Sequence, residues 1–134
     1  MAEALMKSLG GDGIRAFSAG RQPGPGVHLL AVEVLKSRRL WREDLQPKSY
    51  QRFLDGDSPR MDFIIVIGER WPDGLPSSWP GNPRVMQWHI TEPSEGGPES
   101  TTRLTFKKAL MELETRIRLF ILILEKDATK SLAA

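Results

Sequence analysis

The residue types that most often carry chemistry are scarce in this chain. Its 134 residues include two histidines, His28 and His89, and no cysteine. Without cysteine the chain has no disulfide, no thiolate metal ligand and no cysteine nucleophile. The histidines stand far apart, and neither has Cys or Asp neighbours at the spacing of a metal site. We therefore expect no metal and no cofactor, and we interpret His89 as a residue on the surface of a strand.

A charged pair follows the most apolar short stretch of the sequence. Phe63–Ile67 is an uninterrupted apolar run between Asp62 and Gly68, which predicts a strand buried on both faces. Ligands of parallel sheets gather beyond the carboxyl ends of the strands. Glu69 and Arg70 stand at that end, where they could contact an anion or form a solvated pair in a loop.

Helical and strand patterns alternate along the chain. Besides the central strand, the patterns predict helices over residues 2–9, 28–39 and 100–126, helical turns over 48–54, and strands over 14–17 and 84–90. This alternation predicts the α/β class, with a three-layer open parallel sheet and helices on both faces. We expect one domain over residues 1–126 and a frayed tail over residues 127–134.

Charge and hydropathy set limits on partners and location. The formal net charge of +2 is too small to indicate a nucleic-acid partner. The basic residues Lys36, Arg38, Arg39 and Arg42 have Glu33, Glu43 and Asp44 near them in sequence, as on a solvated helix face. Leu119–Leu124 is the longest wholly apolar run, far short of the ~20 residues that span a bilayer. The first residues do not resemble a secretory signal. We expect a cytoplasmic protein without membrane contact.

Two further features leave alternatives open. Trp41, Trp71, Trp79 and Trp88 could form a recognition surface, or they could be packing residues and loop anchors. Within the run from Leu119 to Leu124, some apolar residues lie outside the main stripe of the last helix. Either that helix end is buried on more than one side, or it carries an exposed apolar patch.

Short segments with a fixed order and spacing run along nearly the whole chain. They are Met1–Leu5, Gly10–Gly11, Phe17–Gly20, Val27, Ala31, Met61–Phe63, Trp79–Pro83, Gln87–Trp88 and Thr91–Pro93, followed by the long last helix. In this order they resemble the low-molecular-weight protein tyrosine phosphatase and arsenate reductase family, with greater similarity to its arsenate-reductase branch.

The resemblance implies a chemistry whose central part is absent here. In the family, a loop with a Cys, five residues and an Arg follows the first strand and binds an oxyanion at a helix N-terminus. That loop directly precedes the segment matched by Met1–Leu5. Glu92 matches the Asp that serves the family as general acid, with a carboxyl shifted by one methylene. Such a shift of about 1 Å can cost ~100-fold in rate. Gly68 and Pro76 match extra cysteines of the reductase branch.

The resemblance also implies a missing first strand, between the strand near Ile14 and the strand at Phe63. Its absence would leave two strand edges without partners. The two strands could pair with each other, another chain could supply a strand, either a second copy or a different protein, or this sequence could be a fragment. We expect a non-catalytic phosphatase- or arsenate-reductase-like domain with a binding or regulatory role. The alternative is a piece of an active phosphatase or reductase whose Cys loop lies upstream of Met1.

Overall fold

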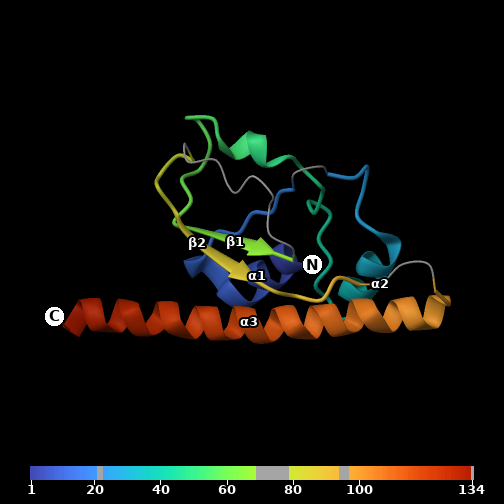
Figure 1. Cartoon of the computed structure of the whole chain (residues 1–134). Helices are drawn as coiled ribbons and strands as arrows, with labels where there is room; N and C mark the ends of the chain where they lie inside the picture. The colour runs from blue at the N-terminus through green and yellow to red at the C-terminus, as the bar shows by residue number, and fades with distance from the viewer. Residues whose placement is uncertain (21–22, 69–78, 94–96, 134) are drawn as a thin grey trace.

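A computed structural model describes residues 1–20, 23–68, 79–93 and 97–133 (Figure 1). Its helices and strands follow the order α1 (Ala2–Gly10), η1 (Gly11–Gly13), α2 (Leu29–Ser37), η2 (Tyr50–Phe53), β1 (Phe63–Ile67), β2 (Arg84–Trp88) and α3 (Glu99–Ala133), where η marks a 3-10 helix. The protein is therefore of the α/β class, as the alternation of patterns predicted.

The sheet of the described residues is a parallel pair of β1 and β2, with Ile65 opposite Met86. The Arg84 N–H donates to the Asp62 carbonyl, and the Gly68 N–H donates to the Trp88 carbonyl, each over 3.0 Å. The backbone groups of successive strand residues point alternately to opposite sides. The even-numbered residues of β1 therefore bond to β2, and the odd-numbered residues direct their N–H and C=O groups to the opposite edge.

The core lies where the three α-helices meet and includes the end of β2. It contains Leu5 of α1, Leu35 of α2, Trp88 of β2, and Leu110 and Ile117 of α3. Figure 1 shows α3 as one long helix running beneath the sheet and α1. Because these helices share a single core, the prediction of helices on both faces of the sheet stays a prediction.

The C-terminal half of α3 resolves one alternative left open by the sequence. Leu119, Leu122 and Ile123 are exposed, whereas Ile117 is fully buried. The helix end therefore carries an exposed apolar patch on the side away from the core. Across the described residues, no helix combines the length and hydropathy needed to cross a membrane. The predicted tail begins inside α3, and the division at residue 126 stays a prediction.

Two strand predictions were wrong. Residues 14–17 form no strand and instead run as a connection that ends in an isolated parallel bridge between Gly20 and Ser49. A strand is defined by its partner, and these residues do not pair with β1. The prediction that β1 is buried on both faces was also wrong, because Val66 is buried but Ile67 is 41% exposed. In the described structure, β1 lies at an edge of the sheet.

Candidate functional site

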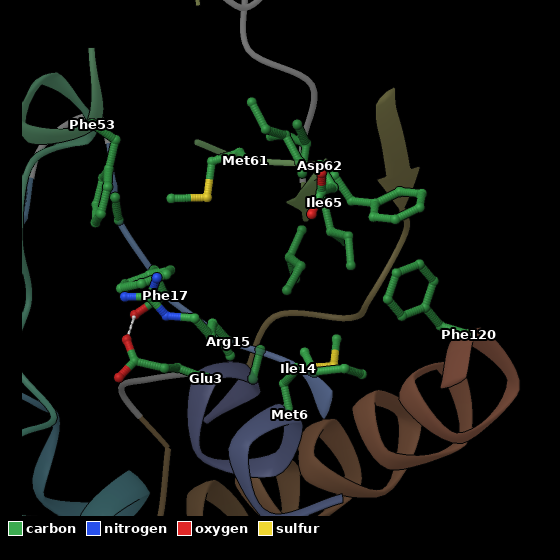
Figure 2. A pocket seen from close by; sticks show the side chains of 18 of the residues that line it. Glu3, Met6, Ile14, Arg15, Phe17, Phe53, Met61, Asp62, Ile65 and Phe120 are labelled. Carbon is green, nitrogen blue, oxygen red and sulfur yellow. Dashed lines mark hydrogen bonds between the residues drawn. The ribbon is translucent and has the colours of Figure 1, made fainter. Parts of the chain in front are cut away.

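A cavity of about 730 Å³ separates β1 from the connection over residues 13–20. Figure 2 shows its apolar side chains converging from α1, the connection, η2, β1 and α3. They include Met6, Ile14, Phe53, Met61, Ile65 and Phe120. We call this cavity the β1 groove. Its volume lies within the range of small-ligand pockets, and the charged residues Glu3, Arg15, Arg60 and Asp62 line it beside the apolar ones.

The wall formed by β1 presents polar backbone atoms among these apolar side chains. Phe63, Ile65 and Ile67 direct their N–H and C=O groups away from β2, toward the groove. Among the described residues, no backbone hydrogen bond from that edge to another segment is present. A strand edge with free donors and acceptors next to an apolar cavity can pair with an added strand.

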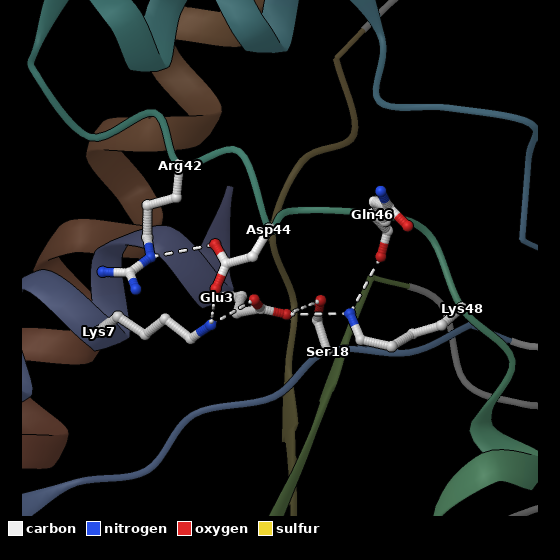
Figure 3. Close-up of polar contacts among 7 residues, drawn as sticks. All are labelled: Glu3, Lys7, Ser18, Arg42, Asp44, Gln46 and Lys48. Atoms are coloured by element: carbon white, nitrogen blue, oxygen red, sulfur yellow. Dashed lines mark hydrogen bonds and ion pairs between the residues drawn. The ribbon is translucent and has the colours of Figure 1, made fainter.

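A buried carboxylate closes one end of the groove. Glu3 of α1, with a side chain only 4% exposed, accepts hydrogen bonds from Ser18 Oγ at 2.6 Å, Lys7 Nζ at 2.9 Å and Lys48 Nζ at 3.3 Å (Figure 3). Lys7 also reaches Asp44 Oδ2 at 3.4 Å. Glu3 therefore ties α1 to the connection over residues 13–20 and to the segment before η2.

Opposing effects act on the pKa of Glu3. Burial is the largest single effect and raises the pKa of this carboxyl. The hydrogen bonds from Ser18 and Lys7, together with the charge and hydrogen bond of Lys48, bring the pKa below its ordinary value of 4.5. Glu3 is therefore ionised at neutral pH, and its negative charge has close cationic partners.

The carboxyl end of β1 brings together two residues that the sequence singled out. Gly68 is buried with φ +90°, and a Cβ built on it would lie 3.5 Å from Glu92 Oε1. Gln87 Nε2 donates to the Gly68 carbonyl at 2.8 Å. The exposed Glu92 thus lies beside this strand end. Its role as general acid stays a prediction. Glu69, Arg70 and Pro76 lie outside the described residues.

The histidines occupy separate places. His28 is the N-cap of α2, where its Nδ1 accepts from the Leu30 N–H at 3.1 Å, and its ring lies 4.7 Å from that of Phe106. His89 lines a second cavity, of about 400 Å³, together with Glu112 and Arg116. No group of His, Asp and Glu suited to a metal ion occurs among the described residues.

The tryptophans also occupy separate environments. Trp88 is buried with its ring edge-on to Phe120, and Trp41 donates to Glu43 Oε1 at 3.1 Å. Trp79 lines the β1 groove and stacks on Tyr50 at 6.2 Å. Trp71 lies outside the described residues. Both Trp79 and Trp88 therefore line the candidate site, and Trp88 also packs in the core.

Sequence reasoning missed Glu3, and it implied a gap between Ile14 and Phe63 without identifying the side chains that line the β1 groove. One signal for Glu3 was available, since Glu3 and Lys7 have the i, i+4 spacing of a helical ion pair. That signal does not reveal Ser18 or Lys48, which only the folded chain brings to the same carboxylate.

Comparison with known proteins shows which known fold this chain resembles. No protein-family model matches the chain. Among solved structures, the crystal structure of an arsenate reductase from Archaeoglobus fulgidus superposes with a TM-score of 0.61 at 23% sequence identity. The match covers 90% of this chain and 86% of the reductase. The chain therefore has an arsenate-reductase-like α/β fold.

Proposed function

We propose that this chain is a phosphatase- or arsenate-reductase-like domain that performs no thiol chemistry of its own and acts by binding. The observation that carries the proposal is an arsenate-reductase-like fold in a sequence of 134 residues without a single cysteine. Cysteine-dependent phosphoryl or arsenate chemistry begins with a thiolate nucleophile. These residues cannot supply one.

Glu92 fits this proposal as a residue without a catalytic partner. Its carboxyl is exposed beside Gly68 and is the one candidate that the resemblance supplies for general acid catalysis. A general acid contributes by protonating a group that a nucleophile is displacing. This sequence contains no cysteine that could perform the displacement. We therefore expect Glu92 to catalyse no reaction in this chain.

The test is turnover by the purified 134-residue chain. We expect hydrolysis of p-nitrophenyl phosphate and thiol-dependent reduction of arsenate to stay at the level of the buffer blank. The matched control is Glu92→Gln, which is expected to give the same blank value. Turnover that exceeds the blank and falls in Glu92→Gln would refute the proposal, because it would show a working general acid.

A specific observation favours a second candidate, in which these residues are part of an active phosphatase or arsenate reductase. Burial lowers the pKa of the Met1 amino group, and the charge of Glu3 opposes this effect by raising it. A charged amino terminus is costly to bury, whereas an amide that continues a chain carries no charge. Ala2 of α1 and Ile67 of β1 line the same β1 groove, so a preceding strand in that groove could lead into α1.

The intact mass of the protein from its native cells separates the two candidates. A mass near 15.1 kDa supports the non-catalytic domain. A mass larger by a strand and a loop supports the second candidate, and the additional residues would then contain a Cys, five residues and an Arg.

A further inference from the structure

We propose that the outer face of α3 is a self-association surface, on which a second copy of this chain packs antiparallel about a two-fold axis at Thr115. The apolar members of this face are each at least half exposed, and they are Leu104, Met111, Leu119, Leu122 and Ile123. The inference does not depend on what occupies the β1 groove. The α3 residues of that groove, Ile117, Phe120 and Leu124, line it from the other side of the helix.

The exposed apolar side chains form one stripe along α3. Leu104 and Leu122 stand about five full turns apart, so they project in the same direction. Met111 and Leu119 depart from that direction by only about 20° and 60°, in opposite senses. Between these two, the Thr115 hydroxyl donates to the Met111 carbonyl at 3.1 Å, so it needs no polar partner from outside. Figure 1 shows the sheet and α1 on the other side of α3.

The apolar area of the stripe is that of a protein interface. Five large apolar side chains, each at least half exposed, present on the order of 500 Å² of apolar surface. A stable interface buries roughly 800 Å² on each partner, of which a little over half is apolar. The same face on a second copy therefore has the area that a stable pair needs.

Antiparallel pairing about Thr115 matches the stripe with its own copy. Met111 and Leu119 are each four residues from Thr115, so Met111 of one copy lies level with Leu119 of the other. Lys108 and Leu122 are each seven residues from Thr115, so they are level as well. The aliphatic stem of Lys108 can cover that leucine while its ammonium group stays in water.

The charges beside the stripe are complementary to a second copy that runs in the opposite direction. Glu112 and Glu114 precede Thr115 by three residues and one. Arg116 and Arg118 follow it by one residue and three. The two-fold axis brings Glu112 of one copy beside Arg116 of the other on one flank, and Glu114 beside Arg118 on the other flank, each pair offset by about 3 Å along the helix.

A parallel second copy would bring like charges together. Glu112 would then lie beside Glu114, and Arg116 beside Arg118, which is repulsive. The reversed order of acids and arginines about one residue therefore favours a two-fold, antiparallel copy of this chain. It is the self-complementarity that an interface between identical partners requires.

Contacts within the chain place these charged groups. Glu112 accepts from the Thr91 N–H at 3.2 Å through Oε2, which holds its carboxylate at the edge of the stripe. Glu114 accepts from Arg38 of α2, and its Oε1 lies 3.5 Å from Arg118 Nε of its own helix. The Arg118 side chain is 59% exposed, so its other nitrogens can reach a second carboxylate. Such rim pairs add little affinity, but they select the orientation.

Sedimentation equilibrium of the 134-residue chain tests the proposal. We expect the mass to rise from 15.1 kDa at about 1 µM toward twice that value at about 500 µM, as for a micromolar interface of this area. Met111→Glu places a charge in the stripe twice in each pair and is expected to weaken association about tenfold or more. The matched control is Val85→Glu, at an exposed apolar residue of the sheet, which should associate like the unchanged chain.

A mixture of two variants tests the antiparallel pairing itself. Glu112→Lys and Arg116→Glu each place like charges side by side in their own pairs, and each is expected to weaken self-association about fivefold or more. Mixed with one another, the two variants present opposite charges at both positions. We therefore expect an equimolar mixture to have a higher mass than either variant alone at the same total concentration. This gain also shows that both variants are folded.

Four results would overturn the proposal. They are a mass of 15.1 kDa at every concentration, growth beyond two copies, equal association of Met111→Glu and the unchanged chain, and a mixture that associates no better than its components. A chain that stays at 15.1 kDa but sediments with anionic phospholipid vesicles, and loses this binding in Met111→Glu, would identify the face as a membrane surface instead. None of these readouts involves turnover, so failure here leaves the proposed function untouched.

Discussion

Glu3 is the single residue on which most of the groove's polar structure depends. It is buried at the start of α1 and accepts hydrogen bonds from residues 4, 15 and 45 positions away in the sequence. Replacing it by glutamine keeps the shape and removes the charge. We expect Glu3→Gln to lower the free energy of unfolding by about 1.5–3 kcal/mol, the range for hydrogen bonds to charged groups, as measured by urea denaturation.

The matched control is Asp12→Asn, which also removes one negative charge. Asp12 is exposed, and its side chain makes no hydrogen bond to any other described residue. We expect this variant to change the free energy of unfolding by less than about 0.5 kcal/mol. Equal effects of the two variants would show that net charge matters and the buried contacts of Glu3 do not.

The same carboxylate makes stability depend on pH. The pKa of Glu3 is lower in the folded protein than its ordinary value of 4.5, so the folded state favours the ionised form. This contribution is fully present above pH 4.5 and is lost as the pH falls through the lower folded pKa. We expect Glu3→Gln to lose less stability than the unchanged chain between neutral pH and about pH 3, measured by urea denaturation at each pH. If the free energy of unfolding falls equally with pH in both proteins, this expectation is contradicted.

Gly68 shows how backbone conformation limits chemistry at the end of β1. Its φ of +90° is one that L residues rarely adopt, so a side chain there would be strained although its Cβ would meet Glu92 Oε1 only at an ordinary contact distance of 3.5 Å. We expect Gly68→Ala to destabilise the fold by about 1–2 kcal/mol. Gly13→Ala is the control, since Gly13 has no positive φ and open space at its Cβ. If both variants have equal thermal midpoints, the conformation of Gly68 is unimportant.

The resemblance identified Gly68 and Glu92 from sequence, and the structure places them together at one strand end. It did not identify the backbone strain that a cysteine would meet at residue 68, because φ is a property of the folded chain. Glu3 was missed for a related reason, since Ser18 and Lys48 become its neighbours only after α1 packs against later segments.

At the scale of elements, α3 organises the core through one face. Leu110 is 1% exposed and packs in the shared core, whereas its neighbour Met111 is 65% exposed. We expect Leu110→Ala to cost about 2–5 kcal/mol of unfolding free energy, through lost burial and a cavity. Met111→Ala removes a side chain of similar size and is expected to change stability by less than about 0.5 kcal/mol. Chemical denaturation of both variants tests this contrast, and comparable losses would mean that Met111 is also covered.

The elements with strong local patterns were predictable, and those defined by distant partners were not. The apolar repeat of α3 and the run Phe63–Ile67 gave a helix and a strand that the structure confirms. Residues 14–17 have strand-like side chains too, but they lack the neighbouring strand that would make them part of a sheet. Ile67 lies in a strand at the edge of the described sheet and is 41% exposed, although its sequence is that of a buried strand.

At the scale of the whole molecule, the β1 groove connects parts that are otherwise held by separate contacts. Side chains from α1, the connection over residues 13–20, β1 and α3 all line it, so an occupant would contact each of them. A ligand that binds only the folded state stabilises the whole domain, by about 2.7 kcal/mol at a hundred times its dissociation constant. For a domain of this size, that corresponds to a rise of roughly 5–15 °C in thermal midpoint.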